Sequence, residues 1–178
     1  MSKTVLVLSS SPRAGGNSDT LCNQFVQGAT EAKHLVEKVV ISKQKINYCK
    51  GCYGCKGNGE CVQKDDMSQI LDKMMTADVI VMATPVYFYT MCAQLKTVID
   101  RTVARYTKLT NKEFYFIMTA AVGSENALKR TVEEFRGFTS CLQGAKEKGI
   151  VYGTGAWDKG DILKSPAMKQ AYEMGKAL

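Results

Sequence analysis

Several features that identify a membrane protein, a secreted protein or a histidine-dependent enzyme are missing from this sequence. Its 178 residues contain no apolar run near the eighteen residues that a membrane helix needs. The apolar stretch close to the N-terminus is interrupted by Ser9-Ser10-Ser11-Pro12, so no signal peptide is expected. The single histidine, His34, leaves almost no material for a catalytic triad. We therefore expect a cytoplasmic protein that has no membrane partner.

The sequence also lacks a block of like charges, although its charge balance is basic. It has 24 Lys and Arg residues against 17 Asp and Glu residues, which gives a net charge of +7. The basic residues are scattered and form no run of five or six. This favours a solvated surface that attracts an anionic cofactor or substrate. A nucleic-acid-binding module, with cysteines in a zinc knuckle, is the weaker alternative, and we expect no nucleic-acid partner.

Strand and helix patterns alternate along the whole chain, with no internal repeat, linker or low-complexity segment. Short apolar runs predict five strands, and apolar residues at helical spacing predict a helix after each of them. This alternation is typical of an α/β fold in which helices cover both faces of a parallel sheet. We expect one domain, residues 1–178, with strands at residues 3–8, 34–42, 78–83, 113–121 and 149–152.

The first expected strand leads through a loop of serines and glycines into a helix, which is the arrangement of an anion-binding site. Free backbone N–H groups and the positive end of the helix dipole would point to one spot. The sequence has no G-x-G-x-x-G motif and no Walker lysine, so the loop suits a single terminal phosphate. The alternative is an ordinary turn in which Asn17 caps the helix. The candidate phosphate ligands are Ser9, Ser11, Arg13, Asn17 and Ser18.

A second candidate ligand segment, Thr84-Pro-Val-Tyr-Phe-Tyr89, follows the third expected strand. Pro85 predicts a loop there, and the three aromatic side chains can cover the face of a flat heteroaromatic ring. The alternative is that these aromatics pack in the core. In a doubly wound sheet, the loops after strands one, three and four meet at the carboxyl end of the sheet. Together they describe a site for a mononucleotide with a large ring, and FMN fits this description.

Several short segments resemble, in order and spacing, those of the flavodoxin-like NAD(P)H-dependent FMN reductase family: Ser11-Pro-Arg13, Gly16-Asn-Ser18, Thr84-Pro-Val-Tyr87, Leu95-Lys96 and Ile99-Asp-Arg101. The likeness is greatest to its iron–sulfur flavoprotein branch. The resemblance implies a flavodoxin-like three-layer sandwich with strand order 2-1-3-4-5, FMN at the switch point, NAD(P)H as co-substrate, and a homodimer or homotetramer. The implied FMN ligands are Ser9, Ser11, Arg13, Asn17 and Ser18 for the phosphate, Thr84, Pro85, Val86, Tyr87 and Phe88 for the ring, and Thr119, Ala120, Ala121 and Gly123 for the loop that closes over it.

Four of the seven cysteines lie in a loop expected at residues 47–64. Their spacing, C-x2-C-x2-C-x5-C with glycines between, lets four thiols reach one cluster and is closer to iron–sulfur ligation than to structural zinc. It also resembles the cluster motif of the iron–sulfur flavoproteins. A [4Fe–4S] cluster, free or oxidisable thiols, and zinc remain alternatives. This loop lies at the same end of the sheet as the FMN site and can reach it, and its candidate ligands are Cys49, Cys52, Cys55 and Cys61.

The leading functional hypothesis is an FMN-dependent oxidoreductase. It would transfer electrons from NAD(P)H, or from a reduced carrier, to a quinone, a nitro or azo compound, a flavin or a protein. No catalytic side chain is predicted, because the flavin carries the chemistry. The alternative is an iron–sulfur flavoprotein that carries electrons between proteins, with FMN and a [4Fe–4S] cluster.

Further interpretations concern single residues around these segments. Asp19 weakens the phosphate site unless its carboxylate points away from the anion. Asp100 and Arg101 are expected to form an ion pair at the end of a helix. Cys141 is expected in the core, and Trp157 either borders the site or makes a subunit contact.

Overall fold

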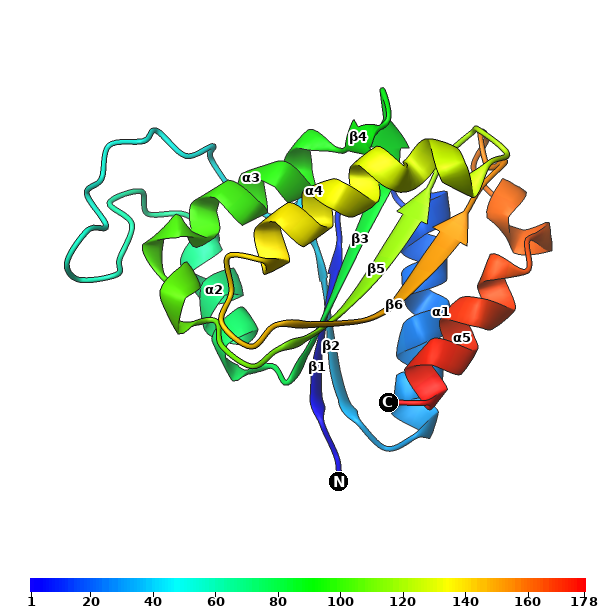
Figure 1. Ribbon diagram of the computed structural model, residues 1–178, viewed down its shortest axis with the longest axis horizontal. Helices are drawn as coiled ribbons and strands as arrows, with labels where there is room; N and C mark the ends of the chain where they lie inside the picture. The colour runs from blue at the N-terminus through cyan, green and yellow to red at the C-terminus, as the bar shows by residue number, and fades with distance from the viewer.

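Five parallel strands form the centre of the computed structural model, which describes residues 1–178 (Figure 1). Their order is β2-β1-β3-β5-β6, which confirms the expected 2-1-3-4-5 order because the remaining strand, β4, lies off this path. The sheet therefore has six strands, one more than predicted. The strands are β1 (Thr4–Ser9), β2 (Leu35–Val40), β3 (Val79–Tyr87), β4 (Thr90–Met91), β5 (Glu113–Thr119) and β6 (Lys146–Gly153).

The five predicted helices are present, and several of them begin or end in a short 3-10 turn. The first helix begins at Asn17 and is preceded by Gly16, so Asn17 is its first residue and not its N-cap. The helices are α1 (Asn17–Glu31), α2 (Met67–Thr76), α3 (Ala93–Arg101), α4 (Lys129–Thr139) and α5 (Ala167–Lys176). The 3-10 turns are η1 (Ile41–Lys43), η2 (Thr102–Ala104), η3 (Tyr106–Lys108), η4 (Glu125–Leu128) and η5 (Asp161–Lys164).

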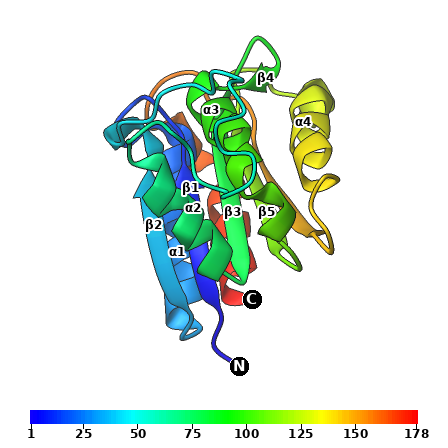
Figure 2. The ribbon, with the colours of Figure 1, turned by 90° about the vertical axis from the view of Figure 1, so that its left-hand side faces the viewer.

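Successive residues of β1 pack against different helical layers. Val5 and Val7 belong to the apolar cluster formed with α1 and α5. Leu6 and Leu8 belong to the cluster formed with α2, α3 and α4. The two layers are visible on opposite faces of the sheet (Figures 1 and 2). Because both faces of β1 are buried, its sequence is apolar without alternation, as expected of a central parallel strand.

The aromatic segment after the third strand is a hairpin and not a loop. β3 continues to Tyr87, which pairs with Thr90 of β4. The two residues of the turn, Phe88 and Tyr89, have positive φ angles of 50° and 63°. Two-residue hairpins need such angles because they match the twist of the paired strands. Phe88 is 97% exposed, so the alternative that these aromatics pack in the core is wrong for this residue.

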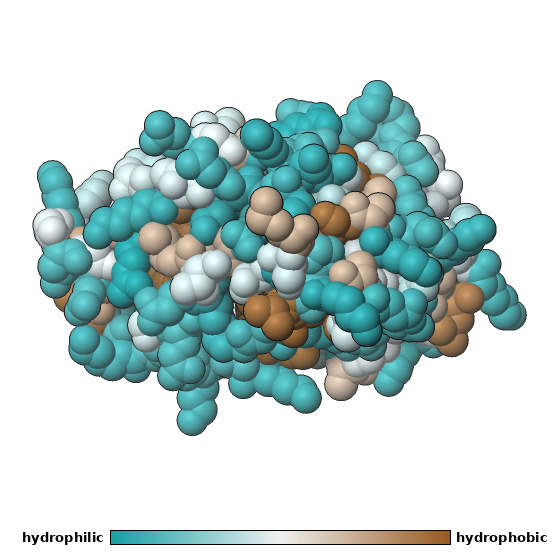
Figure 3. Space-filling model, turned by 90° about the horizontal axis from the view of Figure 1, so that it is seen from below, coloured by the Kyte–Doolittle hydropathy of each residue, from teal (hydrophilic) through white to brown (hydrophobic).

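One face of the molecule, seen from below in Figure 3, is largely polar. The face at the amino ends of the strands is mostly hydrophilic, and its apolar atoms form small separate groups (Figure 3).

Cys141 is exposed near the end of α4, so its expected place in the core is wrong. No helix combines the length and the hydropathy needed to cross a membrane.

Candidate functional site

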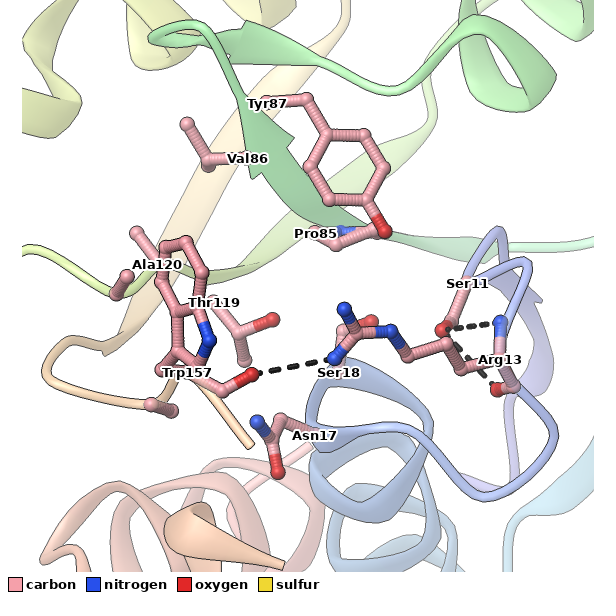
Figure 4. Close-up of a pocket in the computed structure, with 12 residues that line it drawn as sticks. Ser11, Arg13, Asn17, Ser18, Pro85, Val86, Tyr87, Thr119, Ala120 and Trp157 are labelled. Carbon is pink, nitrogen blue, oxygen red and sulfur yellow. Dashed lines mark hydrogen bonds between the residues drawn. The ribbon is translucent and has the colours of Figure 1, made fainter. Parts of the chain in front are cut away.

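A cavity of about 150 Å³ lies at the carboxyl ends of β1, β3 and β5. The three loops that were expected to meet there do meet, and they place side chains from distant parts of the chain around one space (Figure 4). The predicted ligands that line this cavity are Ser11, Arg13, Asn17, Ser18, Pro85, Val86, Tyr87, Thr119, Ala120 and Ala121. The cavity lies where ligands bind in doubly wound sheets.

Four predicted ligands, Ser9, Thr84, Phe88 and Gly123, do not line the cavity. The hydroxyl of Ser9 is buried and donates to Asp19 Oδ1 at 2.6 Å. The hydroxyl of Thr84 is also buried and donates to the carbonyl of the next residue at 2.7 Å. Phe88 projects from the tip of the hairpin into solvent, because it occupies the positive-φ turn.

Two further residues line the cavity: Ala156, which was not predicted, and Trp157, for which the sequence left two roles open. They lie in the connection between β6 and α5. The carboxyl end of β6 lies at the same edge of the sheet as those of β1, β3 and β5. The guanidinium of Arg13 extends across the cavity and its Nη1 donates to the carbonyl of Trp157 at 3.1 Å (Figure 4). The position of β6 in the parallel sheet was the available signal, because every such strand delivers its following loop to the same edge.

The start of α1 supplies an anion cradle at the bottom of this cavity. Ser18 is fully buried, and its hydroxyl has no hydrogen-bond partner. The first N–H groups of a helix have no acceptor within the helix, and those of Asn17 and Ser18 occupy this position. Arg13 has no carboxylate within ion-pair distance. An orphaned hydroxyl, free N–H groups and an unpaired cation together suit a phosphate.

Glycine is required at position 16 because the loop folds back on itself. A Cβ atom on Gly16 would lie 2.5 Å from Ser11 Oγ. That hydroxyl already accepts from the N–H of Arg13 at 3.2 Å and donates to its carbonyl at 3.1 Å. Ser11 therefore shapes the cradle through its own turn.

Asp19 is directed away from the cradle. Its carboxylate accepts a hydrogen bond from Ser9 and forms an ion pair of 2.6 Å with Lys38. Burial raises the pKa of Asp19, but the hydrogen bonds from Lys38 and Ser9 outweigh this effect and lower the pKa below its usual value. The negative charge of Asp19 is compensated by Lys38 of β2, so it does not repel an anion bound at the start of α1.

The four cysteines of the loop line a second cavity, of about 320 Å³, together with Arg101. This cavity shares no lining residue with the first. The loop projects at one end of the long axis of the molecule, and the connection from β6 to α5 lies at the other end (Figure 1). Within one chain the cysteine loop therefore contributes no residue to the first cavity, although its position in the sequence would allow it to reach that site.

Two arginines, Arg101 at the end of α3 and Arg105 just after η2, explain where the cysteine loop lies. Arg101 forms an ion pair with Asp65 at the end of the loop, and Arg105 Nε donates to the carbonyl of Gly59 at 3.0 Å. Asp100 pairs instead with Lys96, so the expected Asp100–Arg101 pair is wrong. Neighbouring helical residues point in different directions, and each finds a partner on its own side.

The cysteine cavity has the chemical groups of a metal site, but its side chains are not gathered around a single metal ion. All seven cysteines are free. No three Cys, His, Asp or Glu side chains of the chain are arranged to hold a metal ion. The loop supplies enough thiols for an iron–sulfur cluster.

The first cavity fits the phosphate end of a mononucleotide. Its enclosed volume is below the 300–1,000 Å³ typical of pockets that bury a whole ligand. The remainder of such a ligand would lie between the partly exposed rings of Tyr87 and Trp157, which flank the opening (Figure 4). The cradle and these rings together have the polarity that a phosphorylated heteroaromatic molecule needs.

The family model described as NADPH-dependent FMN reductase matches residues 4–153. An iron–sulfur flavoprotein of Archaeoglobus fulgidus is 43% identical over 91 residues, which are 51% of this chain and 41% of that protein. The chain spans about half the length of that protein and of two further iron–sulfur flavoprotein relatives. YwqN of Bacillus subtilis (strain 168), whose proposed activity is that of an NAD(P)H-dependent FMN-containing oxidoreductase, is 28% identical over 171 residues, 90% of this chain and 89% of YwqN.

Among solved structures, the FMN complex of an FMN-dependent NADH-azoreductase from Bacillus anthracis str. Ames Ancestor has the same fold. Its TM-score is 0.75 at 17% sequence identity, with 98% of each chain covered. At this identity the likeness establishes the flavodoxin-like fold alone.

Proposed function

Because the chain belongs to the NADPH-dependent FMN reductase family, we propose that it is an oxidoreductase that uses FMN to transfer electrons from NAD(P)H to an acceptor. Bound FMN supplies the chemistry by taking a hydride from the nicotinamide and passing electrons on. The proposed acceptors are a quinone, a nitro or azo compound, a flavin or a protein. The chain itself contributes binding, orientation and exclusion of water.

The observation that carries this proposal is the orphaned hydroxyl of Ser18 in the cradle at the start of α1. A buried hydroxyl without a partner costs stability, by about 1–3 kcal/mol. A phosphate oxygen at this position would accept its hydrogen bond and the N–H of Asn17, and Arg13 would compensate the charge. The cradle therefore favours a ligand that carries a terminal phosphate.

The ring of the ligand would lie against the carboxyl ends of β3 and β5. Pro85, which pairs in register with Thr119, forms a rigid edge without an N–H group. Ala120 and Ala121 are small, so they let a flat ring approach the backbone of their loop. Tyr87 and Trp157 would cover the faces that remain open.

The decisive test is flavin binding followed by turnover. Protein freed of bound flavin would be titrated with FMN and with riboflavin, with binding followed by quenching of flavin fluorescence. We expect FMN to bind more tightly than riboflavin, because only FMN carries the phosphate. We then expect the FMN-loaded protein to oxidise NADH or NADPH in the presence of menadione. Folded protein that binds no FMN would overturn the proposal.

A second candidate function is that of an iron–sulfur flavoprotein that carries electrons. It is favoured by the four cysteines, Cys49, Cys52, Cys55 and Cys61, around one cavity and by the names of the relatives. The test is an assay of iron and sulfide in protein purified without air, with Cys22→Ser as a control outside the loop. About four irons per chain would support the cluster. If the protein contains no iron but oxidises NAD(P)H in a flavin-dependent reaction, the iron–sulfur candidate fails and the FMN-dependent oxidoreductase without a cluster stands.

We further propose a cytoplasmic homodimer or homotetramer. The seven free cysteines suit a reducing compartment. The rings of Phe88, at the tip of the β3–β4 hairpin, and of Trp157, at the cavity, are exposed and would be covered by a second copy. Light scattering after size-exclusion chromatography measures the assembly, and a monomer with full activity would contradict this part.

A further inference from the structure

The turn between β6 and α5 is attached to the start of α1 through the side chain of Asn17. The Nδ2 group of Asn17 donates to the carbonyl of Asp158 at 2.9 Å, and its Oδ1 atom accepts from the N–H of Gly160 at 3.0 Å. A carbonyl only accepts and an N–H only donates, so these partners fix the orientation of the carboxamide. The two bonded residues lie on either side of Lys159, and the backbone of this lysine is thereby held at the rim of the cradle.

The same turn is braced from its own side by Asp161. Its carboxylate accepts from the N–H groups of Trp157 and Asp158 at 3.0 and 2.7 Å. Arg13 adds the hydrogen bond to the carbonyl of Trp157. The side chains of Asn17, Asp161 and Arg13 therefore hold this turn in place beside the cavity.

The side chain of Lys159 extends from this wall toward the serine–glycine loop. A Cβ atom on Gly15 would lie 3.4 Å from both Cε and Nζ of Lys159. No carboxylate lies within ion-pair distance of this ammonium group. Two cations without a carboxylate partner therefore lie near the cradle: Arg13 lines the cavity, and the exposed Lys159 approaches the loop that leads to the fully buried, unpartnered hydroxyl of Ser18.

We propose that Lys159 is a binding residue for the ligand's phosphate and that Asn17 is the residue that positions it. This inference rests on the proposed function, because it names a further contact to the same phosphate. It also changes the role expected of Asn17. One of its two side-chain N–H groups is used on Asp158 and its Oδ1 atom on Gly160, so we assign the contribution of Asn17 to the anion to its backbone N–H.

Lysine contributes a mobile point charge whose attraction to a phosphate depends on salt. Replacement by methionine keeps most of the length of the side chain and removes the charge. We expect Lys159→Met to weaken FMN binding about ten-fold, as for the loss of one charge-assisted contact, and to leave riboflavin binding unchanged. The salt dependence of FMN binding should also become weaker.

The matched control is Lys164→Met, on η5 a few residues further along the chain. Like Lys159, Lys164 is exposed and lines neither cavity, but its side chain does not lie within 4 Å of a Cβ built on Gly15. Its replacement should change neither FMN nor riboflavin binding. Lys159→Arg should retain most of the FMN affinity, because it retains the charge.

The positioning role of Asn17 is tested by combining variants and measuring the ratio of FMN to riboflavin affinity. Asn17→Ala should lower this ratio in the wild-type background and leave it unchanged in the Lys159→Met background. If wild-type protein binds FMN and Lys159→Met binds it equally well, the inference fails and the proposed function stands. If Asn17→Ala lowers the ratio equally in both backgrounds, the positioning role fails. If folded wild-type protein binds no FMN, the proposed function and the inference both fail.

Discussion

Arg101 and Asp65 form a two-point ion pair in which both side chains are buried. Arg101 Nη1 lies 2.7 Å from Asp65 Oδ2, and Nη2 lies 2.9 Å from Oδ1. The side chains are only 1% and 4% exposed. This pair joins the last residue of α3 to the segment that follows the four cysteines, and Arg101 Nη1 also donates to the carbonyl of Asn47 at the start of that loop. One guanidinium therefore holds both ends of the cysteine loop.

The free energy of unfolding should fall at low pH, because Asp65 becomes protonated and its ion pair with Arg101 is lost. Burial raises the pKa of Asp65, but hydrogen bonds from Arg101 and from the N–H groups of Asn47 and Met67 outweigh it and lower the pKa to about 2, from an ordinary value of 3.8. Because the folded-state pKa is the lower one, the contribution is fully present above about pH 4 and is lost as the pH falls toward 2. It amounts to about 2 kcal/mol. Urea unfolding between pH 7 and pH 2 measures it, and Asp65→Asn should lack this component.

Replacement of one member of the Arg101–Asp65 pair should lower the free energy of unfolding more than protonation of Asp65 does. We expect Arg101→Met to lower the free energy of unfolding by about 3–5 kcal/mol, because the carboxylate of Asp65 would remain buried without a partner. Lys96→Met is the control on the same helix, since Lys96 and Asp100 form an exposed pair. Exposed pairs contribute less than about 1 kcal/mol. Equal effects of the two substitutions would show that the Arg101 pair is not buried in solution.

The hydroxyl of Ser18 should oppose stability and favour ligand binding. We expect Ser18→Ala to leave the free energy of unfolding unchanged or to raise it by about 1 kcal/mol, because a buried hydroxyl without a partner is removed. The same substitution should weaken FMN binding about ten-fold. Thr102→Ala is the control, because its buried hydroxyl donates to the carbonyl of Ile99 at 2.7 Å. That variant should lose stability and bind FMN normally.

The turn of the β3–β4 hairpin should be stabilised by residues that tolerate positive φ. Replacement of Phe88-Tyr89 by Asn-Gly should raise the free energy of unfolding by about 1–2 kcal/mol, because aromatic residues are unfavourable in this conformation. Thermal denaturation of the flavin-free protein measures the change. The double variant Phe88→Ala, Tyr89→Ala removes the rings and keeps the positive φ angles, so it should show no such gain. A loss of stability in the Asn-Gly variant would mean that the rings are packed in solution.

Two glycines let α1 and α5 pack with their backbones in contact. A Cβ atom on Gly28 would lie 2.1 Å from the carbonyl oxygen of Tyr172, and one on Gly175 would lie 2.1 Å from that of Phe25. We expect Gly28→Ala to lower the free energy of unfolding by about 3 kcal/mol, because backbone atoms cannot move aside as a side chain can. Chemical denaturation measures this loss.

Gly137 is the matched control for Gly28. It also lies within a helix, α4, but an added Cβ would meet no atom within 4 Å. Gly137→Ala should raise the free energy of unfolding by about 1 kcal/mol through helix propensity alone. If both alanine variants behaved alike, the close approach of α1 and α5 would not exist in solution.

The expected fold and most of the expected cavity were accessible from the sequence, because they depend on local patterns. The apolar run of β1 and the alternation of strands with helices define a parallel sheet, and such a sheet brings the loops after its strands to one edge. That is why Arg13, Pro85 and Thr119 could be assigned to one site before their distances were known. The hairpin at Phe88 was not expected, because aromatic residues in a left-handed turn are contrary to ordinary turn preferences.

The sequence by itself determined the alternation of strands and helices, the serine–glycine loop at the start of α1 and the grouping of four cysteines in one segment. Only the tertiary structure decided that Asn17 holds the turn around Lys159, that Trp157 borders the cavity, and that Arg101 pairs with Asp65 and not with Asp100. These are contacts between residues far apart in the chain. Periodicity and turn preferences report the path of the backbone, whereas the choice among distant partners depends on which side chains the packed helices and strands bring within reach.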